Sequence, residues 1–302
     1  MTTFSHVRPA REYERVLQQR EADGYRFYQE FSAAFVDVER CPACDSPTTH
    51  ASFEKYHFKH RVCTRCFTLF TSPRPPEKLL GTYYNHYESP RLWTELLLQA
   101  DAARKALQYK PRVELVVACL RSLGVGQVAR VYDIGAGSGA FSLCLKEDIF
   151  FSEIVAVDVS TRCVAVCSER GLKTFLGSVV DLPPESADGI FLNVLIEHVF
   201  DPHTFLLSCH QTLRPGGFLC LATPNGEGLD FKILGSRTRN ITPPEHLTYF
   251  NPVAMPLLFQ RANFETVFNQ TPGKLDVEMI HREREHGFAL AEHNAYLDYL
   301  FG

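Results

Sequence analysis

From residue 129 onward, short apolar segments alternate with amphipathic segments in a regular order. The apolar segments have the length and composition of buried strands, and the amphipathic ones repeat every three to four residues, as helices do. This alternation indicates an α/β fold with a mostly parallel sheet covered on both faces. The predicted elements are strands at 129–134, 153–157, 173–176, 189–192 and 217–222, with helices at 141–147, 162–170 and 202–212.

The two ends of the chain have different patterns. Residues 252–261 predict a helix, and residues 264–269 and 276–281 predict two strands. The turn segment Thr-Pro-Gly-Lys at 271–274 lies between them, so they predict a hairpin in which one strand runs antiparallel. Upstream of the strand–helix region, further helices are predicted within 10–35 and 77–123, in the latter most clearly over 92–107 and 113–123.

Five segments are expected along the chain. Two Cys-x-x-Cys pairs define a small unit, and the proline-rich run Ser-Pro-Arg-Pro-Pro at 72–76 ends it. The expected division is an N-terminal helical segment (1–40), a cysteine-bearing unit (41–76), a helical linker or lid (77–127), the strand–helix domain (128–283) and a C-terminal tail (284–302).

The composition is that of a globular protein with a substantial core. Hydrophobic residues make up 45% of the 302 residues and charged residues 22%, which excludes a disordered, collagen-like or coiled-coil chain. The net charge of −4 lacks the basic surplus typical of proteins that bind nucleic acid through its phosphates. The sequence contains no signal-peptide pattern and no long apolar run. We therefore expect a cytoplasmic protein without a membrane span, whose cysteines stay reduced.

A glycine-rich turn follows the first predicted strand of the sheet. The segment DIGAGSG (133–139) ends that strand and opens a helix. Glycines there allow positive φ angles and a close approach of the backbone to a ligand. The helix N-terminus favours an anionic group. The Gly-x-Gly-x-Gly spacing departs from the Gly-x-Gly-x-x-Gly pattern of dinucleotide-binding proteins, which argues against NAD.

Asp158 follows the second predicted strand, 21 residues after Gly137. A carboxylate at this position accepts hydrogen bonds from the ribose hydroxyls of a nucleoside. The alternative is that Asp158 caps the next helix, which is a common role for aspartate. Together with the glycine turn, Asp158 indicates a nucleoside ligand.

These segments resemble class I S-adenosylmethionine-dependent methyltransferases. The glycine turn resembles the first motif of that family, and three further segments agree with it in order. The resemblance extends over about 110–283 and implies a Rossmann-like, seven-stranded sheet with an antiparallel last strand. The three further segments are GSVVDLP (177–183), NVLIEHVFDP (193–202) and LRPGGFL (213–219).

The resemblance also implies the residues that bind the cofactor. The glycine turn and Asn193 would hold the methionine end, Asp158 the ribose and Val159 the adenine. The family often has aspartate where this chain has Ser178, so either Ser178 or Asp181 would accept a hydrogen bond from the adenine amino group. The complete implied set is Asp133, Gly135, Ala136, Gly137, Asp158, Val159, Ser178, Val179 and Asn193.

Four cysteines have the spacing of a zinc site. Cys41 and Cys44 form one Cys-x-x-Cys pair, and Cys63 and Cys66 form the second. Two such pairs supply four thiolates, which leaves no open coordination position, so we expect a structural zinc ribbon. The ribbon segment has five basic and two acidic residues, and Zn²⁺ with four thiolates would lower its charge to about +1.

The ribbon followed by tyrosines resembles a subgroup of small-molecule methyltransferases that includes deoxysugar C-methyltransferases. Tyr83, Tyr84, His86 and Tyr87 would either close over the cofactor or pack between domains. Glu245-His246 resembles the Glu-His segment of that subgroup, in which the histidine is a proposed base. The resemblance thus implies that His246 is catalytic and that Glu245 orients it. The alternative is that His246 braces the loop through a backbone carbonyl.

The predicted function is methyl transfer from S-adenosylmethionine to a small-molecule metabolite, such as a sugar nucleotide. One alternative is a methyltransferase acting on bases of rRNA or tRNA, which the charge balance argues against. Another is a cofactor-binding scaffold without catalysis. Glu197-His198 is expected to be structural and to begin the loop that leads to Asp201, the predicted cap of the following helix.

Overall fold

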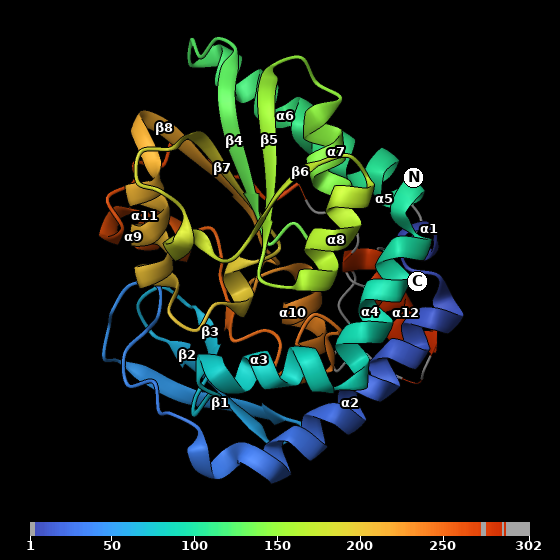
Figure 1. Ribbon diagram of the computed structural model, residues 1–302. Helices are drawn as coiled ribbons and strands as arrows, with labels where there is room; N and C mark the ends of the chain where they lie inside the picture. The colour runs from blue at the N-terminus through green and yellow to red at the C-terminus, as the bar shows by residue number, and fades with distance from the viewer. Residues whose placement is uncertain (1–3, 273–275, 286, 288–302) are drawn as a thin grey trace, which may run out of the picture.

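The computed structural model describes residues 4–272, 276–285 and 287. Two sheets and a set of N-terminal helices make up the molecule (Figure 1). None of the helices in the described part of the chain is long and apolar enough to span a bilayer.

The main sheet has five parallel strands in the order β6-β5-β4-β7-β8. The strand order reverses between β4 and β7, and sheets of this kind bind ligands at the carboxyl ends of the strands at such a reversal. All five strands predicted from the apolar segments are present. They are β4 (Val128–Ile134), β5 (Phe151–Asp158), β6 (Lys173–Leu176), β7 (Ala187–Asn193) and β8 (Leu213–Ala222).

Helices cover both faces of the main sheet. Neighbouring residues of each strand point to opposite faces, so apolar side chains on both faces need a covering layer. On β7, Phe191 packs edge-on against Phe141 of α7, with 5.6 Å between ring centroids. Its neighbour Ile190 belongs to a separate apolar cluster with Leu206 of α9 and Leu258 of α11. The covering helices are α6 (Lys110–Ser122), α7 (Ala140–Lys146), α8 (Thr161–Glu169), α9 (Pro202–Thr212) and α11 (Ala254–Arg261).

A second, antiparallel sheet contains the cysteine-bearing segment. Its order is β1-β2-β3-β9, so a strand from the C-terminal half completes a sheet that the N-terminal half begins. The backbone N–H of Thr71 also donates to the carbonyl of Leu247, at 2.9 Å. The strands are β1 (Thr49–Lys55), β2 (Phe58–Cys63), β3 (Leu69–Thr71) and β9 (Thr248–Tyr249).

The remaining helices come from both ends of the chain. The long helix α2 packs along α4, and an apolar cluster that includes Tyr13, Leu92 and Leu96 fills their contact (Figure 1). A π-helical turn at Lys105–Tyr109 leads from α5 into α6. The helices are α1 (Phe4–Val7), α2 (Ala10–Phe31), α3 (Glu77–His86), α4 (Glu88–Gln99), α5 (Asp101–Arg104), α10 (Leu229–Leu234) and α12 (Asp276–Glu285). Short 3₁₀ turns lie at Ser32–Ala34, Val179–Asp181, Ile196–His198 and Gly235–Arg237.

The predicted C-terminal hairpin is wrong, and the described residues of the main sheet contain five strands instead of seven. Residues 264–269 form no strand, and Val267 and Phe268 are 64% and 49% exposed, so they have no sheet face to cover. Residues 276–285 form helix α12. Met279 is buried in the α2–α4 cluster, so a tertiary contact stabilises this segment as a helix.

The tyrosines after the ribbon mostly form an aromatic core. Tyr83 and Tyr87 are buried against Phe27 and Phe58, which supports packing between segments for these two residues. Tyr84 differs, because it is 41% exposed and its hydroxyl lies 2.9 Å from Nδ1 of His198.

Candidate functional site

The glycine turn lies at the carboxyl end of β4, where the topology predicts a ligand site. Gly135 and Gly137 have φ angles of 73° and 56°, which L-residues with side chains rarely adopt. A Cβ atom added to Gly137 would meet no other atom within 4 Å, so open space faces this part of the turn. A Cβ on Gly135 would instead strike the Leu195 side chain at 2.8 Å. Its positive φ and this contact therefore both disfavour a side chain at Gly135.

Asp133 is buried at the start of this turn. Its Oδ2 accepts a hydrogen bond from the Ser142 hydroxyl at 2.5 Å, whereas its Oδ1 has no partner in the described structure. Burial raises the pKa of this carboxyl to about 7. An orphaned acceptor beside open space fits the ammonium group of a methionine moiety, which would supply both a donor and a positive charge.

Asp158 supports the turn from the end of β5. Its Oδ2 accepts from the backbone N–H of Gly137 at 2.9 Å, and its Oδ1 accepts from the N–H of Ser160 at 2.8 Å. The cap of helix α8 is Ser160, whose hydroxyl accepts from Cys163. Asp158 is therefore not the helix cap, and its carboxylate links the glycine turn to the segment after β5, where a ribose would lie.

The residues predicted to lie near the adenine differ in how accessible their side chains are to a ligand. Val159 is 73% exposed, so its apolar side chain is available to a ligand. Val179 is only 1% exposed and belongs to the core, so its side chain is not available. Ser178 and Asp181 bond to each other in a capping box, in which the Ser178 N–H donates to Asp181 Oδ2 at 2.8 Å.

A cavity of about 190 Å³ connects the glycine turn with the loop that carries His246. Asn193 lines it from the end of β7, and its side-chain oxygen accepts a hydrogen bond from Arg112. Val194, the next lining residue, has a φ of 61°, a strained conformation for a β-branched residue that turns the chain away from β7. The cavity brings together six of the predicted site residues, namely Asp133, Gly135, Ala136, Gly137, Asn193 and His246.

His246 lines this cavity from the loop before β9. Its Nδ1 donates to the carbonyl of Asn240 at 2.9 Å, because a carbonyl can only accept. Nε2 is consequently the unprotonated nitrogen. Burial and the nearby His198 and Arg20 hold the pKa of His246 well below its usual value, so the ring is neutral at physiological pH. The two histidine rings meet edge to face, with centroids 4.6 Å apart.

The expectation that Glu245 orients His246 is wrong for its side chain. The Glu245 carboxylate forms a bidentate, buried ion pair with Arg20 of α2, at 2.9 and 2.8 Å. The carbonyl of Asn240 performs the orienting role instead. The backbone of Glu245 contacts the neighbouring histidine of the site, because its carbonyl lies 3.0 Å from Nδ1 of His198.

Glu197 and His198 lie beside His246, although the sequence suggested a structural role for both. One ligand-type atom from each of the three side chains lies within 4.8 Å of the others. Glu197 is fully buried; its Oε2 accepts from Thr223 at 3.0 Å and its Oε1 has no partner among the described residues. Burial raises its pKa to about 7. Asp201 caps α9 as predicted, accepting from the backbone of its second and third residues.

The four predicted zinc ligands converge at one point beside the end of β2, whose last residue is Cys63. The Sγ atoms of Cys41 and Cys66 are 3.5 Å apart, those of Cys44 and Cys63 are 3.6 Å apart, and all four lie within 4.8 Å of one another. Tetrahedral zinc with Zn–S bonds of about 2.3 Å requires sulfur separations of roughly 3.8 Å. The quartet therefore fits a structural zinc ion.

A family model described as "Methyltransferase domain" matches residues 84–268, which is more than half of the chain. The chain therefore belongs to this family of methyltransferase domains. The match covers β4 to β8, the glycine turn and His246, and it begins after the cysteine quartet.

Curated relatives and solved structures carry related names. The ubiquinone biosynthesis O-methyltransferase of Xanthomonas oryzae pv. oryzae is 33% identical over 106 residues, which is 32% of this chain and 44% of that protein. The protein of the same name from Xanthomonas axonopodis pv. citri is 33% identical over 137 residues, 42% of this chain and 55% of that protein. The chain thus spans about half the length of these relatives.

Among solved structures, a SAM-dependent methyltransferase from Thermotoga maritima, titled a possible histamine N-methyltransferase, is similar to this chain. It is 19% identical with a TM-score of 0.45, and the match covers 58% of this chain and 80% of that one.

Proposed function

We propose that this chain transfers the methyl group of S-adenosylmethionine to a small-molecule acceptor, and that its cysteine quartet holds a structural zinc ion. The observation that carries the proposal is the single cavity shared by the glycine turn and His246. That arrangement supports the proposal, because a cofactor held at the glycine turn and the neutral imidazole of His246 would then face one shared space, as an acid–base transfer reaction requires.

The cofactor-binding role rests on the contacts of the turn. The orphaned oxygen of Asp133 would accept from the methionine ammonium group, and the carboxylate of Asp158 would accept from the ribose hydroxyls. Val159 would cover the adenine with its exposed side chain. When bound, the cofactor would supply an electrophilic methyl group, which the acceptor attacks in line as S-adenosylhomocysteine leaves.

His246 would remove the acceptor's proton. Its Nδ1 proton is held by the Asn240 carbonyl, so Nε2 has the free lone pair that a general base needs. As the acceptor atom attacks the methyl group, its proton would pass to Nε2. The depressed pKa of His246 keeps this nitrogen unprotonated across the neutral range. In this proposal His246 would have both roles considered from the sequence, one at each ring nitrogen.

The experiment is an assay for S-adenosylhomocysteine formation with sugar nucleotides, phenols and RNA as acceptors. With an acceptor in hand, His246→Ala is expected to lower kcat by about 10²–10⁴-fold, the range for positioned acid–base catalysis. The affinity for S-adenosylhomocysteine should stay unchanged. His210→Ala is the matched control, because His210 is exposed on α9 outside the cavity.

Two results would redirect this proposal. Turnover with RNA alone would favour the nucleic-acid alternative, and cofactor binding without turnover on any acceptor would favour a scaffold. A loop-bracing role alone for His246 predicts that His246→Ala lowers stability and acceptor affinity while kcat at saturating acceptor stays near normal.

A further inference from the structure

Arg20 joins the N-terminal helices to the loop that carries His246. Its side chain extends from α2, and its Nε and Nη2 donate to the two carboxylate oxygens of Glu245 at 2.9 and 2.8 Å. Both members of the pair are buried. A guanidinium and a carboxylate that share two hydrogen bonds are fixed in direction as well as in distance. The pair therefore sets where Glu245 lies relative to α2.

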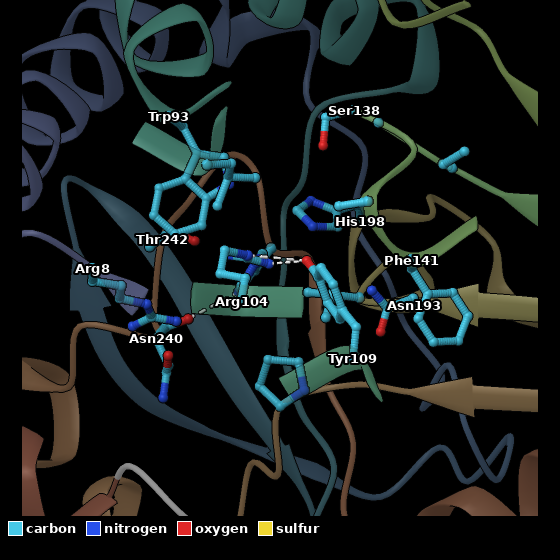
Figure 2. A pocket seen from close by; sticks show the side chains of 18 of the residues that line it. Arg8, Trp93, Arg104, Tyr109, Ser138, Phe141, Asn193, His198, Asn240 and Thr242 are labelled. Atoms are coloured by element: carbon cyan, nitrogen blue, oxygen red, sulfur yellow. Dashed lines mark hydrogen bonds between the residues drawn. The ribbon is translucent and has the colours of Figure 1, made fainter. Parts of the chain in front are cut away.

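Trp93 of α4 fixes the face of the same guanidinium group. The guanidinium carbon of Arg20 lies 4.4 Å from the centroid of the indole ring, which is the geometry of a cation–π contact. Arg20 lines the cavity together with Trp93, His198 and Thr242, and the last three are labelled in Figure 2. Because Trp93 holds the plane of the guanidinium and Glu245 holds one edge, Arg20 has one orientation at the cavity wall.

The backbone of the loop that begins at Thr242 connects Glu245 to both histidines of the site. The N–H groups of Glu245 and His246 both donate to the carbonyl of Thr242, at 2.9 and 3.1 Å. The carbonyl of Glu245 lies 3.0 Å from Nδ1 of His198. A shift of Glu245 would therefore move the His246 ring and change the contact with His198 at the same time.

We propose that Arg20 is a positioning residue of the active site, which acts through Glu245 to fix the loop that presents His246 to the acceptor. This inference rests on the proposed methyltransferase function and adds a residue from the N-terminal helices to it. Burying two charges costs free energy that their attraction often only offsets, so a buried ion pair is weak evidence for a role in stability. A pair that lies at the cavity wall, one residue from His246, is placed to set the geometry of the site.

The positive charge of Arg20 also acts on His246 itself. Burial holds the pKa of His246 well below its usual value, and the charges of His198 and Arg20 lower it further. Arg20→Gln removes one of those charges and leaves the Glu245 carboxylate unpaired, and both changes raise the pKa of His246. The titratable and charged groups around the His246 ring are Arg8, Arg20, Glu197, His198, Glu245 and Tyr249.

The first measurement needs neither cofactor nor acceptor. The full chain with ¹³C-labelled histidines is titrated by NMR between about pH 5 and 8, the range in which histidines change charge. The ring signal of His246 is assigned by its absence in His246→Gln. In Arg20→Gln this signal should change to that of a protonated ring at a higher pH than in the unmodified chain. Arg20→Lys keeps the charge, so its His246 signal should follow that of the unmodified chain.

The second measurement uses an acceptor that the unmodified chain methylates. Arg20→Gln should lower kcat by about 10–100-fold, the scale for a displaced catalytic group, while the affinity for S-adenosylhomocysteine stays unchanged. Arg20→Lys loses the paired N–H donors and should also lower kcat. The double variant Arg20→Gln with Glu245→Gln removes both charges and keeps an amide pair, so it should recover part of the kcat that Arg20→Gln loses.

Arg15→Gln is the matched control, because Arg15 is exposed on α2 outside the cavity and its loss changes the net charge equally. It should leave the His246 titration and kcat unchanged. An unaltered His246 titration or an unaltered kcat in Arg20→Gln would overturn the inference while leaving the methyltransferase proposal intact. A loss of S-adenosylhomocysteine affinity in Arg20→Gln as large as its loss of kcat would also overturn it, since the pair would then support the whole domain. Failure of the unmodified chain to bind S-adenosylhomocysteine is the separate result that counts against the proposed function.

Discussion

Removing zinc should unfold the ribbon and the sheet domain together. From its spacing alone, the ribbon would be expected to loosen first as a separate unit. In the structure the cysteines belong to the same apolar cluster as Phe250 and Leu258, and β9 completes the ribbon's sheet. The loop that carries His246 leads directly into β9, so loss of the metal would displace a wall of the cavity.

The strength of this coupling follows from the hydrogen bonds between the two parts. Arg261 donates to the carbonyls of Pro42 and Ala43 at 3.1 and 2.8 Å. Asn251 donates to the carbonyl of Cys66 at 2.8 Å. With the Thr71 bond to the backbone before β9, these are four bonds at a net stabilisation of about 1 kcal/mol each. A coupling of about 4 kcal/mol corresponds to about one molecule in a thousand with the ribbon opened separately.

The assay uses the single tryptophan of the chain. Trp93 lines the cavity from α4, so its fluorescence reports on the sheet domain's ligand site. Zinc release is followed in the same sample with a metallochromic dye during titration with urea. We predict that the two transitions coincide, because the ribbon cannot open without breaking contacts to the sheet domain.

Weakening the contact should separate the transitions. In Arg261→Ala zinc should be released at lower urea than the Trp93 change, whereas Arg214→Ala removes a surface pair with Asp188 and should leave the transitions together. Zinc release well before any change at Trp93 in the unmodified chain would refute this coupling and show that the ribbon unfolds independently.

Three further outcomes are expected. Asp158→Ala should weaken S-adenosylhomocysteine binding by about 1.5–3 kcal/mol in calorimetry, the scale of hydrogen bonds to a charged group, and an unchanged affinity would count against its ribose role. Glu245→Gln leaves the buried charge of Arg20 uncompensated and should lower the free energy of unfolding by about 3–5 kcal/mol in denaturant titrations; equal stability would mean that the pair contributes nothing. Burial holds the pKa of Glu197 at about 7, above its usual 4.5, so the stability from its neutral form is complete below pH 4.5 and is lost as the pH rises through 7. Glu197→Gln should remove that decline, worth at most about 3 kcal/mol, and an identical pH profile in both proteins would contradict it.

The sequence was sufficient wherever one local pattern decides the structure. The apolar segments of the sheet, the glycine turn and the cysteine spacing each have a short-range signature, and all three lie where predicted. The C-terminal hairpin failed because 276–281 is a short mixture of apolar and polar residues, and contacts with α2 and α4 set which of them are buried. No local signal distinguishes those two outcomes.

The candidate site was only partly predictable for the same reason. The Arg20–Glu245 pair joins residues 225 positions apart, so the sequence around Glu245 does not identify Arg20 as its partner. The only candidate partner nearby in the sequence was His246. The role of Asn240 also depends on how the N-terminal helices cover the sheet. The adjacent Glu-His at 197–198 was the one available signal for His198, because it follows a strand whose carboxyl end faces the ligand site.

The central claim is that the glycine turn binds the methyltransferase cofactor, and isothermal titration of the purified chain with S-adenosylhomocysteine tests it most directly. The account predicts one site per chain, with Asp158→Ala binding more weakly than the unmodified protein. Absence of binding by the unmodified chain, or tighter binding of NAD than of S-adenosylhomocysteine, would contradict it.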